Sequence, residues 1–407
     1  MELLWISAFS PYTNSGSAGS KTFEYYFKHV VSMPDFSVSL LSIDWYQKTK
    51  AADYDWSNFK SCKRFKILYN DGSVFEKGKN FVNKFNLLDP MQNLVSPLVK
   101  SRIFSTLQEW KNDGYRPNII ILEWTNMVVL ADDIKKLFPN AKLVASEHDV
   151  TYVGYKRKAN YYSGLKSFFW KEKYKREKKT ELSALEMCDL ILPHNPDNTE
   201  LLVGDGVQKE KIMWLTPYFH NFRNVNRTGK YKKRDILFFG AMSRPENYLS
   251  VKWFLEQVMP RLADVDVSFV ILGSNPPEEL KTYQSERVII TGFVDDPTPF
   301  FAQSLCLVAP LVLGAGIKVK VIEGLSAGIP VLTNSIGIEG IAARDSVEYC
   351  HCETPEQYEQ CIRKVLAGEL DDVGENGGKF VEQKYDLKQS ADSYVKRLRS
   401  MGNDSDL

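Results

Sequence analysis

Short apolar runs alternate with segments of helical periodicity along almost the whole of the 407-residue chain. The runs at 3–8, 37–43 and 118–124 have the length and apolar character of strands buried on both faces. Between many of them, apolar residues recur at the three- and four-residue spacing of a helix face. This alternation is typical of parallel sheets covered by helices, so the sequence predicts a doubly wound α/β protein.

The alternating pattern forms two series. The first predicts strands at 3–8, 37–43, 118–124, 142–146, 190–193 and 212–215, with helices at 22–33 and 130–138. The second predicts strands at 235–239, 267–272, 287–290, 305–309 and 329–333, helices at 248–262 and 317–326, and a helical tail from 355 onward. Residues 221–234 between the series are polar and basic, as in an interdomain linker.

Two Rossmann-like domains are therefore expected. We place the N-terminal domain at 1–220 and the C-terminal domain at 234–384, with a closing helix at 385–407 that crosses back to the first domain. Ligands bind beyond the carboxyl ends of the strands in open α/β sheets. Two such domains facing each other would hold a ligand in the cleft between them.

Composition narrows the class of protein. Hydrophobic residues make up 43% of the chain and charged residues 25%, which is typical of globular domains with sizeable cores. The net charge of +1 argues against a dedicated nucleic-acid binder. Six scattered cysteines form no disulfide framework, and no apolar run is long enough to span a bilayer. The first nine residues include Glu2 and no basic residue, unlike a signal peptide, so we expect a cytoplasmic protein.

A loop of small residues, 15–20, follows the first predicted strand and contains Gly16 and Gly19. Small residues allow close approach of a ligand to the backbone, and the following helix N-terminus favours anions. A flexible turn is the alternative interpretation. The loop has neither the spacing of a dinucleotide fingerprint nor the Gly-Lys-Ser/Thr ending of a Walker loop.

The segment 313–340 carries the strongest functional signal. Gly314 and Gly316 would free backbone amides before a helix, where a diphosphate is favoured by the helix dipole. Lys318 and Lys320 follow in a position that suits cations only when an anion is present. Glu323 could accept two hydrogen bonds from a ribose diol. The alternative is that these three side chains are solvated surface groups.

This segment resembles the nucleotide-binding motif of the GT-B glycosyltransferases, specifically the retaining family four enzymes ("glycosyl transferases group 1"). Residues 238–247, 270–274 and 288–296 resemble the strands and loops of the same domain in that family. The tail at 380–398 is similar to its closing helices. In the first half, the small-residue loop and Glu147-His148-Asp149 resemble the family's glycine loop and histidine-bearing loop.

The resemblance implies transfer of a sugar from a nucleoside diphosphate sugar, with UDP or GDP as the expected carrier, to an acceptor hydroxyl. It implies retention at the anomeric carbon and no metal or other cofactor. His148 would lie by the transferred sugar. The resemblance implies donor binding by Gly16, Val294, Gly314, Ala315, Gly316, Ile317 and Glu323. We expect Gly19, Ser243, Arg244, Asn247 and Lys318 to complete the donor site.

Two departures from the family pattern affect the donor site. The family commonly has a second glutamate eight positions before Glu323, where this chain has Ala315. The family also places an Arg and a Lys in the first loop of the second domain, and here that loop is 241–247, with its usual spacing lost. Our hypothesis is that Lys318 supplies the missing positive charge.

Two strand-end residues are candidate catalytic groups. His148 and Glu123 each lie at the carboxyl end of a predicted strand, where sites form in such sheets, although a structural role is the alternative for both. Two metal interpretations are weaker. Asp295-Asp296 has the context of a helix cap, and Cys350-His351-Cys352 with Cys361 matches no standard zinc spacing.

A basic and aromatic stretch, 156–179, has two interpretations. It predicts either a solvated helix with one core face or a surface that touches anionic membranes at a lipid-linked acceptor. The stretch 75–100 is a weaker second candidate. For the whole chain, the alternatives to a transferase in polysaccharide or glycolipid assembly are an epimerase or phosphorylase of the same architecture and a non-catalytic nucleotide-sugar-binding protein.

Overall fold

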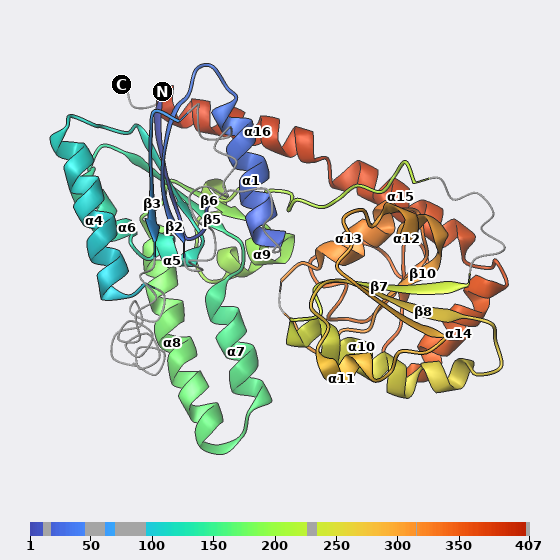
Figure 1. The fold of residues 1–407 in the computed structure, drawn as a ribbon. Helices are drawn as coiled ribbons and strands as arrows, with labels where there is room; N and C mark the ends of the chain where they lie inside the picture. Colours follow the sequence, from blue (N-terminus) through green and yellow to red (C-terminus); the bar gives the residue numbers. More distant parts are fainter. Residues whose placement is uncertain (11–17, 45–61, 70–94, 226–233, 315, 404–407) are drawn as a thin grey trace. The chain divides into compact units, whose positions relative to one another are not determined.

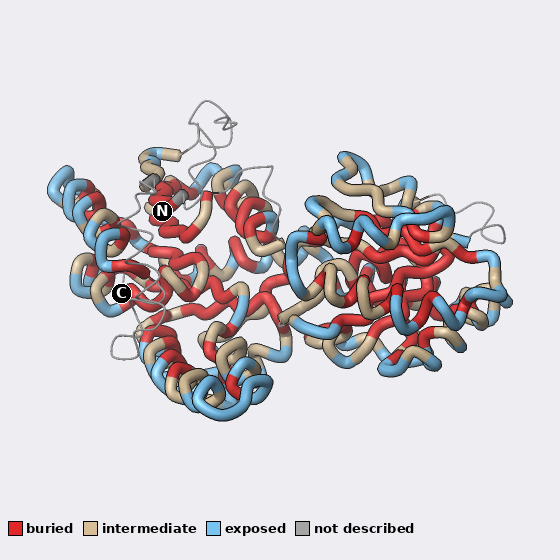
Figure 2. The backbone as a smooth tube through the Cα atoms, turned by 60° about the horizontal axis from the view of Figure 1, so that its bottom comes forward, coloured by how far each residue is buried: buried red, intermediate tan, exposed pale blue. Residues whose placement is uncertain are grey.

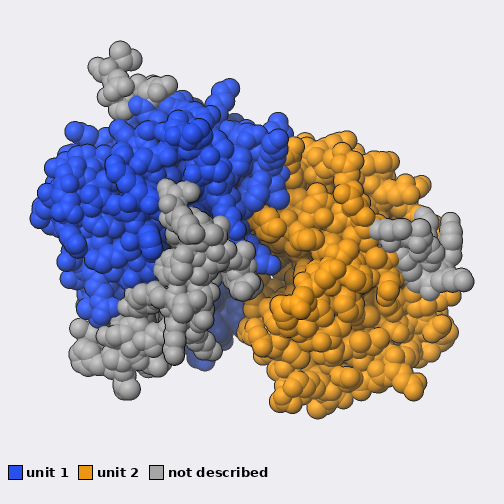
Figure 3. Space-filling view, turned by 45° about the horizontal axis from the view of Figure 1, so that its top comes forward, with its two compact units in different colours: residues 1–217, 387–407 blue, residues 218–386 orange. Residues whose placement is uncertain are grey.

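The computed structural model describes residues 1–10, 18–44, 62–69, 95–225, 234–314 and 316–403. The chain forms two compact units, coloured separately in Figure 3. Unit 1 comprises Met1–Pro217 and Leu387–Leu407, and unit 2 comprises Tyr218–Asp386. The start of the expected linker therefore belongs to unit 2, where the Phe222 ring stacks on Phe301 with centroids 3.9 Å apart.

The sheet of unit 1 has six parallel strands in the order β3-β2-β1-β4-β5-β6 (Figure 1). Its strands are β1 (Glu2–Ser7), β2 (Ser37–Asp44), β3 (Arg64–Tyr69), β4 (Ile119–Glu123), β5 (Lys142–Glu147) and β6 (Leu190–Pro193). The strand predicted at 212–215 is wrong, because this segment makes a single isolated bridge from Ile212 to Ile191. It runs beside β6 and buries Leu215 without forming a ladder.

Helices cover both faces of this sheet. They are α1 (Ala18–Val31), α4 (Pro97–Asn112), α5 (Thr125–Val128), α6 (Ala131–Leu137), α7 (Thr151–Tyr161), α8 (Gly164–Glu186), α9 (Pro196–Gly204) and α16 (Leu387–Asn403). Alternate residues of β1 point to opposite faces: Leu4 belongs to the core that includes α4 and α6, and Leu3 to the core shared with α1 and α16. The closing helix thus completes unit 1.

Unit 2 repeats the same sheet order, with β12-β11-β10-β7-β8-β9 all parallel. Its strands are β7 (Asp235–Phe239), β8 (Ser268–Leu272), β9 (Val288–Gly292), β10 (Ser304–Ala309), β11 (Val331–Thr333) and β12 (Cys350–His351). Its α-helices are α10 (Pro245–Gln257), α11 (Glu278–Lys281), α12 (Thr298–Gln303), α13 (Val319–Ser326), α14 (Pro355–Leu366) and α15 (Asp371–Lys384). The predicted doubly wound α/β class is confirmed, and the strands form the buried centre of each unit (Figure 2).

The shared strand order fixes where a ligand site can form. In each sheet the chain builds outward from the first strand in one direction and then, from the fourth strand, in the other. The switch point lies between β1 and β4 in unit 1 and between β7 and β10 in unit 2. Ligands of such sheets bind beyond the carboxyl ends of the strands at this point. No described helix combines the length and hydropathy that crossing a bilayer requires.

Candidate functional site

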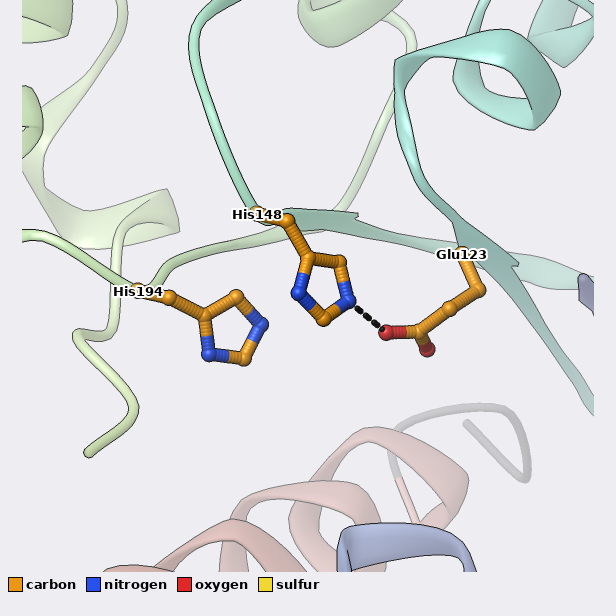
Figure 4. A group of neighbouring side chains, drawn as sticks. All are labelled: Glu123, His148 and His194. Atoms are coloured by element: carbon orange, nitrogen blue, oxygen red, sulfur yellow. Dashed lines mark hydrogen bonds and ion pairs between the residues drawn. The ribbon is translucent and has the colours of Figure 1, made fainter. Parts of the chain in front are cut away.

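Three titratable side chains meet at the carboxyl edge of the unit 1 sheet (Figure 4). Glu123 ends β4, His148 follows the last residue of β5, and His194 follows the last residue of β6. Because parallel strands end at the same edge, residues far apart in sequence become neighbours there. Glu123 also pairs with Ser7 at the end of β1, which places it at the switch point.

Glu123 is the centre of this group and is almost fully buried. Its Oε2 accepts a hydrogen bond from Trp5 Nε1 at 2.7 Å. Its Oε1 accepts from Ser146 Oγ and is 2.7 Å from His148 Nε2. A carboxylate can only accept, so Nε2 of His148 carries the proton toward Glu123. The other ring nitrogen, Nδ1, is the one left to face a ligand.

The His148 ring is held between two other rings. Trp124 and His194 both stack on it, each with its centroid 4.4 Å from that of His148 and with interplanar angles of 16° and 20°. His194 Nε2 lies 3.1 Å from Ser146 Oγ, which connects it to Glu123. Burial lowers the pKa of His194 well below its usual range, so His194 stays neutral. The stacking leaves His148 only its ring edge for contact with a substrate.

Gly19, in the first turn of α1, faces that edge. A Cβ atom added at Gly19 would lie 3.2 Å from Nδ1 of His148 and 3.5 Å from Nε1 of Trp124. Two ring nitrogens and the amides of a helix N-terminus therefore converge where the chain has no side chain, an arrangement suited to an oxygen-rich ligand. No sequence pattern indicates a role for Trp124, whose φ of 69° is unusual for a bulky residue at a strand end. Gly16, the other predicted loop glycine, lies outside the described residues.

The same three residues are also the candidate ligands of a metal ion. Glu123, His148 and His194 each offer a ligand atom, all within 4.8 Å of one another. Both Glu123 oxygens are already occupied by N–H and O–H donors, and stacked imidazoles do not aim their lone pairs at one point. The arrangement fits a hydrogen-bond network better than an ion. The cysteines of the zinc alternative, Cys350 and Cys352, are buried in the core of unit 2.

Lys320 lies at the switch point of unit 2. Its Nζ donates to Asn247 Oδ1 at 2.6 Å and lies 4.3 Å from the centroid of the Phe238 ring. Gly240, which follows β7, makes room for it, since a Cβ there would lie 2.8 Å from Nζ. Within the part of the chain that the structure describes, no carboxylate is at ion-pair distance from Lys320. Burial lowers the pKa of this ammonium to about 7.

Lys318 is placed differently from its neighbour. It is the N-cap residue of α13, its Nζ donates to the Gly316 carbonyl, and it lies 3.6 Å from the Glu339 carboxylate. Its positive charge therefore already has an acidic neighbour. Lys320 instead reaches the loop after β7, where the family places its cations. The assignment of Lys318 as the source of a positive charge for the donor stays a prediction.

Glu323 lies on α13 and is largely buried. Its Oε1 accepts the backbone N–H of His220 at 3.1 Å, which fixes the first segment of unit 2 against α13. Gly314 and Gly316 adopt φ values of 141° and 71°, conformations that favour glycine, in the loop leading to Ile317 and the helix. Ala315 lies outside the described residues. Gly314, Gly316, Ile317 and Glu323 thus lie on one loop-helix segment at the carboxyl end of β10.

The other predicted donor residues lie on two further loops of unit 2. Ser243 and Arg244 are exposed before α10, and Arg244 pairs with Glu246, whereas Asn247 is buried and holds Lys320. Val294 is half-buried after β9. Asp296 Oδ1 accepts a hydrogen bond from the amide of Thr298, the first residue of α12, while the N-cap residue of that helix is Pro297.

Known proteins resemble this chain in the sequence of its second unit and in its fold. Residues 233–368 match the family described as glycosyl transferases group 1. A curated relative, the "uncharacterized 44.6 kDa protein in cps region" of Klebsiella pneumoniae, is 26% identical over 223 residues. That alignment covers 49% of this chain and 55% of the relative, so the chain spans about half the length of the relative it matches.

Solved structures match over nearly the full length. Sucrose-phosphate synthase from Thermosynechococcus elongatus aligns with a TM-score of 0.70 and 12% identity, covering 98% of this chain and 99% of that one. Anabaena Alr3699/HepE in complex with UDP-glucose aligns with a TM-score of 0.64 and 11% identity, covering 98% and 100%. The lipopolysaccharide outer core galactosyltransferase WaaB gives 0.64 and 12%, with the same coverage.

At such identities the structural likeness shows the fold alone. It confirms the predicted GT-B architecture, whereas the retaining family four assignment stays a prediction. The chain has the fold of the GT-B glycosyltransferases, and its second unit matches the glycosyl transferases group 1 family over residues 233–368.

Proposed function

We propose that this protein is a retaining, metal-independent glycosyltransferase that moves a sugar from a nucleoside diphosphate sugar to an acceptor hydroxyl. Unit 2 binds the nucleotide and diphosphate, and unit 1 supplies the acceptor side together with His148 and Glu123. The family match of unit 2 and the donor complex of a structural neighbour support a nucleotide sugar as substrate. UDP or GDP is the proposed carrier.

The observation that carries this proposal is the environment of Lys320. Lys320 is half-buried, and its desolvated ammonium has no carboxylate at ion-pair distance within the described residues. Such a cation is costly, and a bound anion reduces the cost. Lys320 lies in the first turn of α13, where the helix dipole also favours negative charge. A diphosphate placed there would gain from both effects. As it departs with increasing charge, the same groups would stabilise it electrostatically.

His148 suits a role beside the reacting sugar. Its Nδ1 is the available hydrogen-bonding atom because Nε2 is hydrogen-bonded to Glu123, and its ring is stacked between Trp124 and His194. Glu123 is a positioning residue in this proposal, since it orients His148 and contacts no substrate. The acceptor is proposed to be a growing polysaccharide or a lipid-linked glycan, in the cytoplasm and at the inner face of the membrane. The name of the curated relative, from a cps region, and that of the lipopolysaccharide galactosyltransferase accord with such a setting.

The first experiment is thermal unfolding of the protein with UDP, GDP, ADP, CDP and dTDP, using NAD as a control. A ligand at about 100 times its dissociation constant adds about 2.7 kcal/mol of stability. We expect a shift with one of the diphosphates that is lost in Glu323→Ala and Lys320→Ala. A shift with NAD alone would overturn the proposal.

Product analysis then separates transfer from related reactions. Incubation with the donor identified by the thermal shift, with and without an oligosaccharide acceptor, should yield an acceptor-dependent glycoside with the donor's anomeric configuration. Epimerised donor formed without acceptor would show an epimerase instead. Donor binding without turnover on any acceptor would favour a non-catalytic binding protein.

A further inference from the structure

Helices α7 and α8 form an antiparallel hairpin that projects from unit 1 (Figure 1). The connection between them is only Tyr162 and Ser163, and Gly164 opens α8 with a φ of 59° that reverses the chain. Residues 156–171 make up the outer part of the hairpin, which we call the hairpin tip. Most of the tip is exposed. It lies at the far end of the hairpin from the buried edge of the sheet that carries His148.

The inner part of the hairpin is firmly held. Glu181 on α8 accepts the amides of Thr151 and Tyr152 at 3.0 and 3.2 Å, which caps the start of α7. Further out, the rings of Tyr155 and Trp170 stack across the two helices at 5.7 Å. Lys158 Nζ lies 4.7 Å from the Trp170 ring, and Lys173 Nζ lies 4.9 Å from the Tyr155 ring. The hairpin tip is therefore attached to unit 1 through two helices that are held together by these contacts.

The tip exposes large apolar side chains where a fully solvated hairpin would place polar ones. Leu165 is 89% exposed, Tyr161 74% and Phe168 63%, and Tyr162 is also exposed. They are adjacent to the turn, on the end of α7 and the first turns of α8. A cluster of exposed apolar residues at one tip signals an interaction surface, whereas isolated ones do not.

Positive charge surrounds these side chains. The hairpin tip contains Lys156, Arg157, Lys158, Lys166 and Lys171 and no acidic residue, although the whole chain carries a net charge of only +1. Lysine and arginine can extend their charged ends toward an interface while aromatic rings sit at headgroup level. Basic residues with interleaved aromatics are attracted to anionic lipid surfaces.

We propose that the hairpin tip docks unit 1 on an anionic lipid bilayer, with Tyr161, Leu165 and Phe168 entering the headgroup region and the basic residues contacting lipid phosphates. This inference deepens the acceptor side of the proposed function, because a protein held at a bilayer meets a lipid-linked acceptor there. The residues of the hairpin tip that support this inference are separate from those of the donor site.

A second copy of the chain is the competing occupant. Stable dimers commonly bury roughly 800 Å² on each partner. The exposed apolar side chains here occupy only the end of one hairpin. Bringing two tips together would also oppose two clusters of five positive charges, which repel each other. Charge complementarity therefore favours a lipid surface.

The test is co-sedimentation of the full-length protein with vesicles, without donor or acceptor. We expect binding to vesicles of equal parts phosphatidylglycerol and phosphatidylcholine at low salt, weak binding to phosphatidylcholine alone, and release at high salt. One basic residue contributes about a fivefold change in partitioning. The variant Lys166→Glu/Lys171→Glu should therefore bind at least about twentyfold more weakly. Leu165→Ser/Phe168→Ser should lose at least about tenfold.

Matched controls carry the same changes elsewhere on unit 1. Lys388→Glu/Lys396→Glu on α16 and Leu98→Ser on α4 replace exposed residues and should bind as the parent does. Equal binding to both lipid mixtures, equal losses in the controls, or a dimer that the tip variants convert to monomer would each overturn the proposal. The thermal shift with diphosphates should persist in the tip variants, so failure here is distinguishable from failure of the donor site.

Discussion

At the scale of single residues, the space beside Gly19 that faces His148 offers a test of the unit 1 site. In Gly19→Ala the new methyl group would lie 3.2 Å from His148 Nδ1. If a substrate oxygen occupies that place, kcat/KM should fall about tenfold to a hundredfold, the loss of one hydrogen bond to a charged or polarised group. Because alanine suits a helix, the free energy of unfolding should stay within about 1 kcal/mol of the parent.

Gly154 provides the matched control for that substitution. It lies within α7, and a Cβ there would meet nothing within 4 Å. Gly154→Ala should keep full activity and match or exceed the parent in thermal stability. Steady-state kinetics of both variants measures kcat/KM, and thermal unfolding measures their stability. Unchanged kcat/KM in Gly19→Ala would remove His148 Nδ1 from the substrate site.

Lys320 predicts that donor binding depends on pH. The free protein holds this pKa at about 7, and a bound diphosphate would raise it by stabilising the ammonium. Above pH 7, binding therefore takes up a proton, and nucleoside diphosphate affinity should weaken by up to about tenfold per pH unit between 7 and 9. Calorimetric titration in buffers of different ionisation enthalpy measures both the affinity and the proton uptake.

Replacing Lys320 by methionine should remove that pH dependence. We expect Lys320→Met to bind the diphosphate about tenfold to a hundredfold more weakly at pH 7. The free energy of unfolding should change by no more than about 2 kcal/mol, because removal of a desolvated cation is offset by leaving Asn247 Oδ1 without its donor. Lys318→Met should have the smaller effect, since Lys318 already lies beside Glu339. The opposite ranking of the two variants would restore Lys318 as the main phosphate ligand.

At the scale of elements, the base of the α7–α8 hairpin should titrate. Burial raises the pKa of Glu181 to about 8 and raises that of nearby Glu147 well above its usual range. Both folded-state values exceed the ordinary carboxyl value, so the folded protein binds more protons than the unfolded chain between about pH 5 and 8. The free energy of unfolding should therefore fall as pH rises through this window.

Glu181→Gln should reduce that slope by at most about 1.4 kcal/mol per pH unit. Glu172→Gln is the control on the same helix, because a hydrogen bond from Lys175 lowers the pKa of Glu172 instead. Chemical denaturation at pH 5.5 and 8 measures the difference. An unchanged slope in Glu181→Gln would show that this carboxyl does not titrate with folding.

The elements that the sequence predicts well are those with continuous apolar runs. β1, β4 and β10 are almost entirely buried, and short apolar runs of this kind are typical of strands covered on both faces of a parallel sheet. The sequence does not predict β3, because Arg64 and Lys66 interrupt its apolar pattern at the edge of the sheet. At 212–215 only Leu215 is fully buried, and the run forms no strand because pairing depends on partners that a local pattern does not contain.

In the candidate site, too, the sequence predicts some residues but not the geometry that brings them together. Strand-end position is enough to select Glu123 and His148, and the glycine pattern is enough to select the segment before α13. The stacking of Trp124 and His194 on His148 depends on how three strand ends are rotated relative to one another. The contact of Lys320 with the loop after β7 joins residues 73 positions apart. The spacing of residues along the sequence predicts neither the stacking on His148 nor the contact of Lys320 with this loop.

At the scale of the whole molecule, unit 2 is continuous in sequence and has its own sheet and core. We expect the fragment 218–386 to fold alone and to keep the thermal shift with the diphosphate that stabilises the full chain. Circular dichroism and cooperative unfolding are the measurements. A fragment that unfolds without cooperativity would show that unit 2 needs unit 1 for its stability.

Unit 1, in contrast, is assembled from two segments of the sequence that are separated by the whole of unit 2. Helix α16 buries Tyr394 and Leu398 against the same sheet face that holds Leu3 and Trp5. During synthesis, α16 leaves the ribosome after all of unit 2, so this sheet face is not covered by α16 until then. A chain that stops before Leu387 would contain all of unit 2, but the sheet face of unit 1 that α16 covers would be exposed to solvent. This face of the first unit can therefore be buried only after α16 has been synthesised, and until then the chain exposes apolar surface of the kind that promotes aggregation.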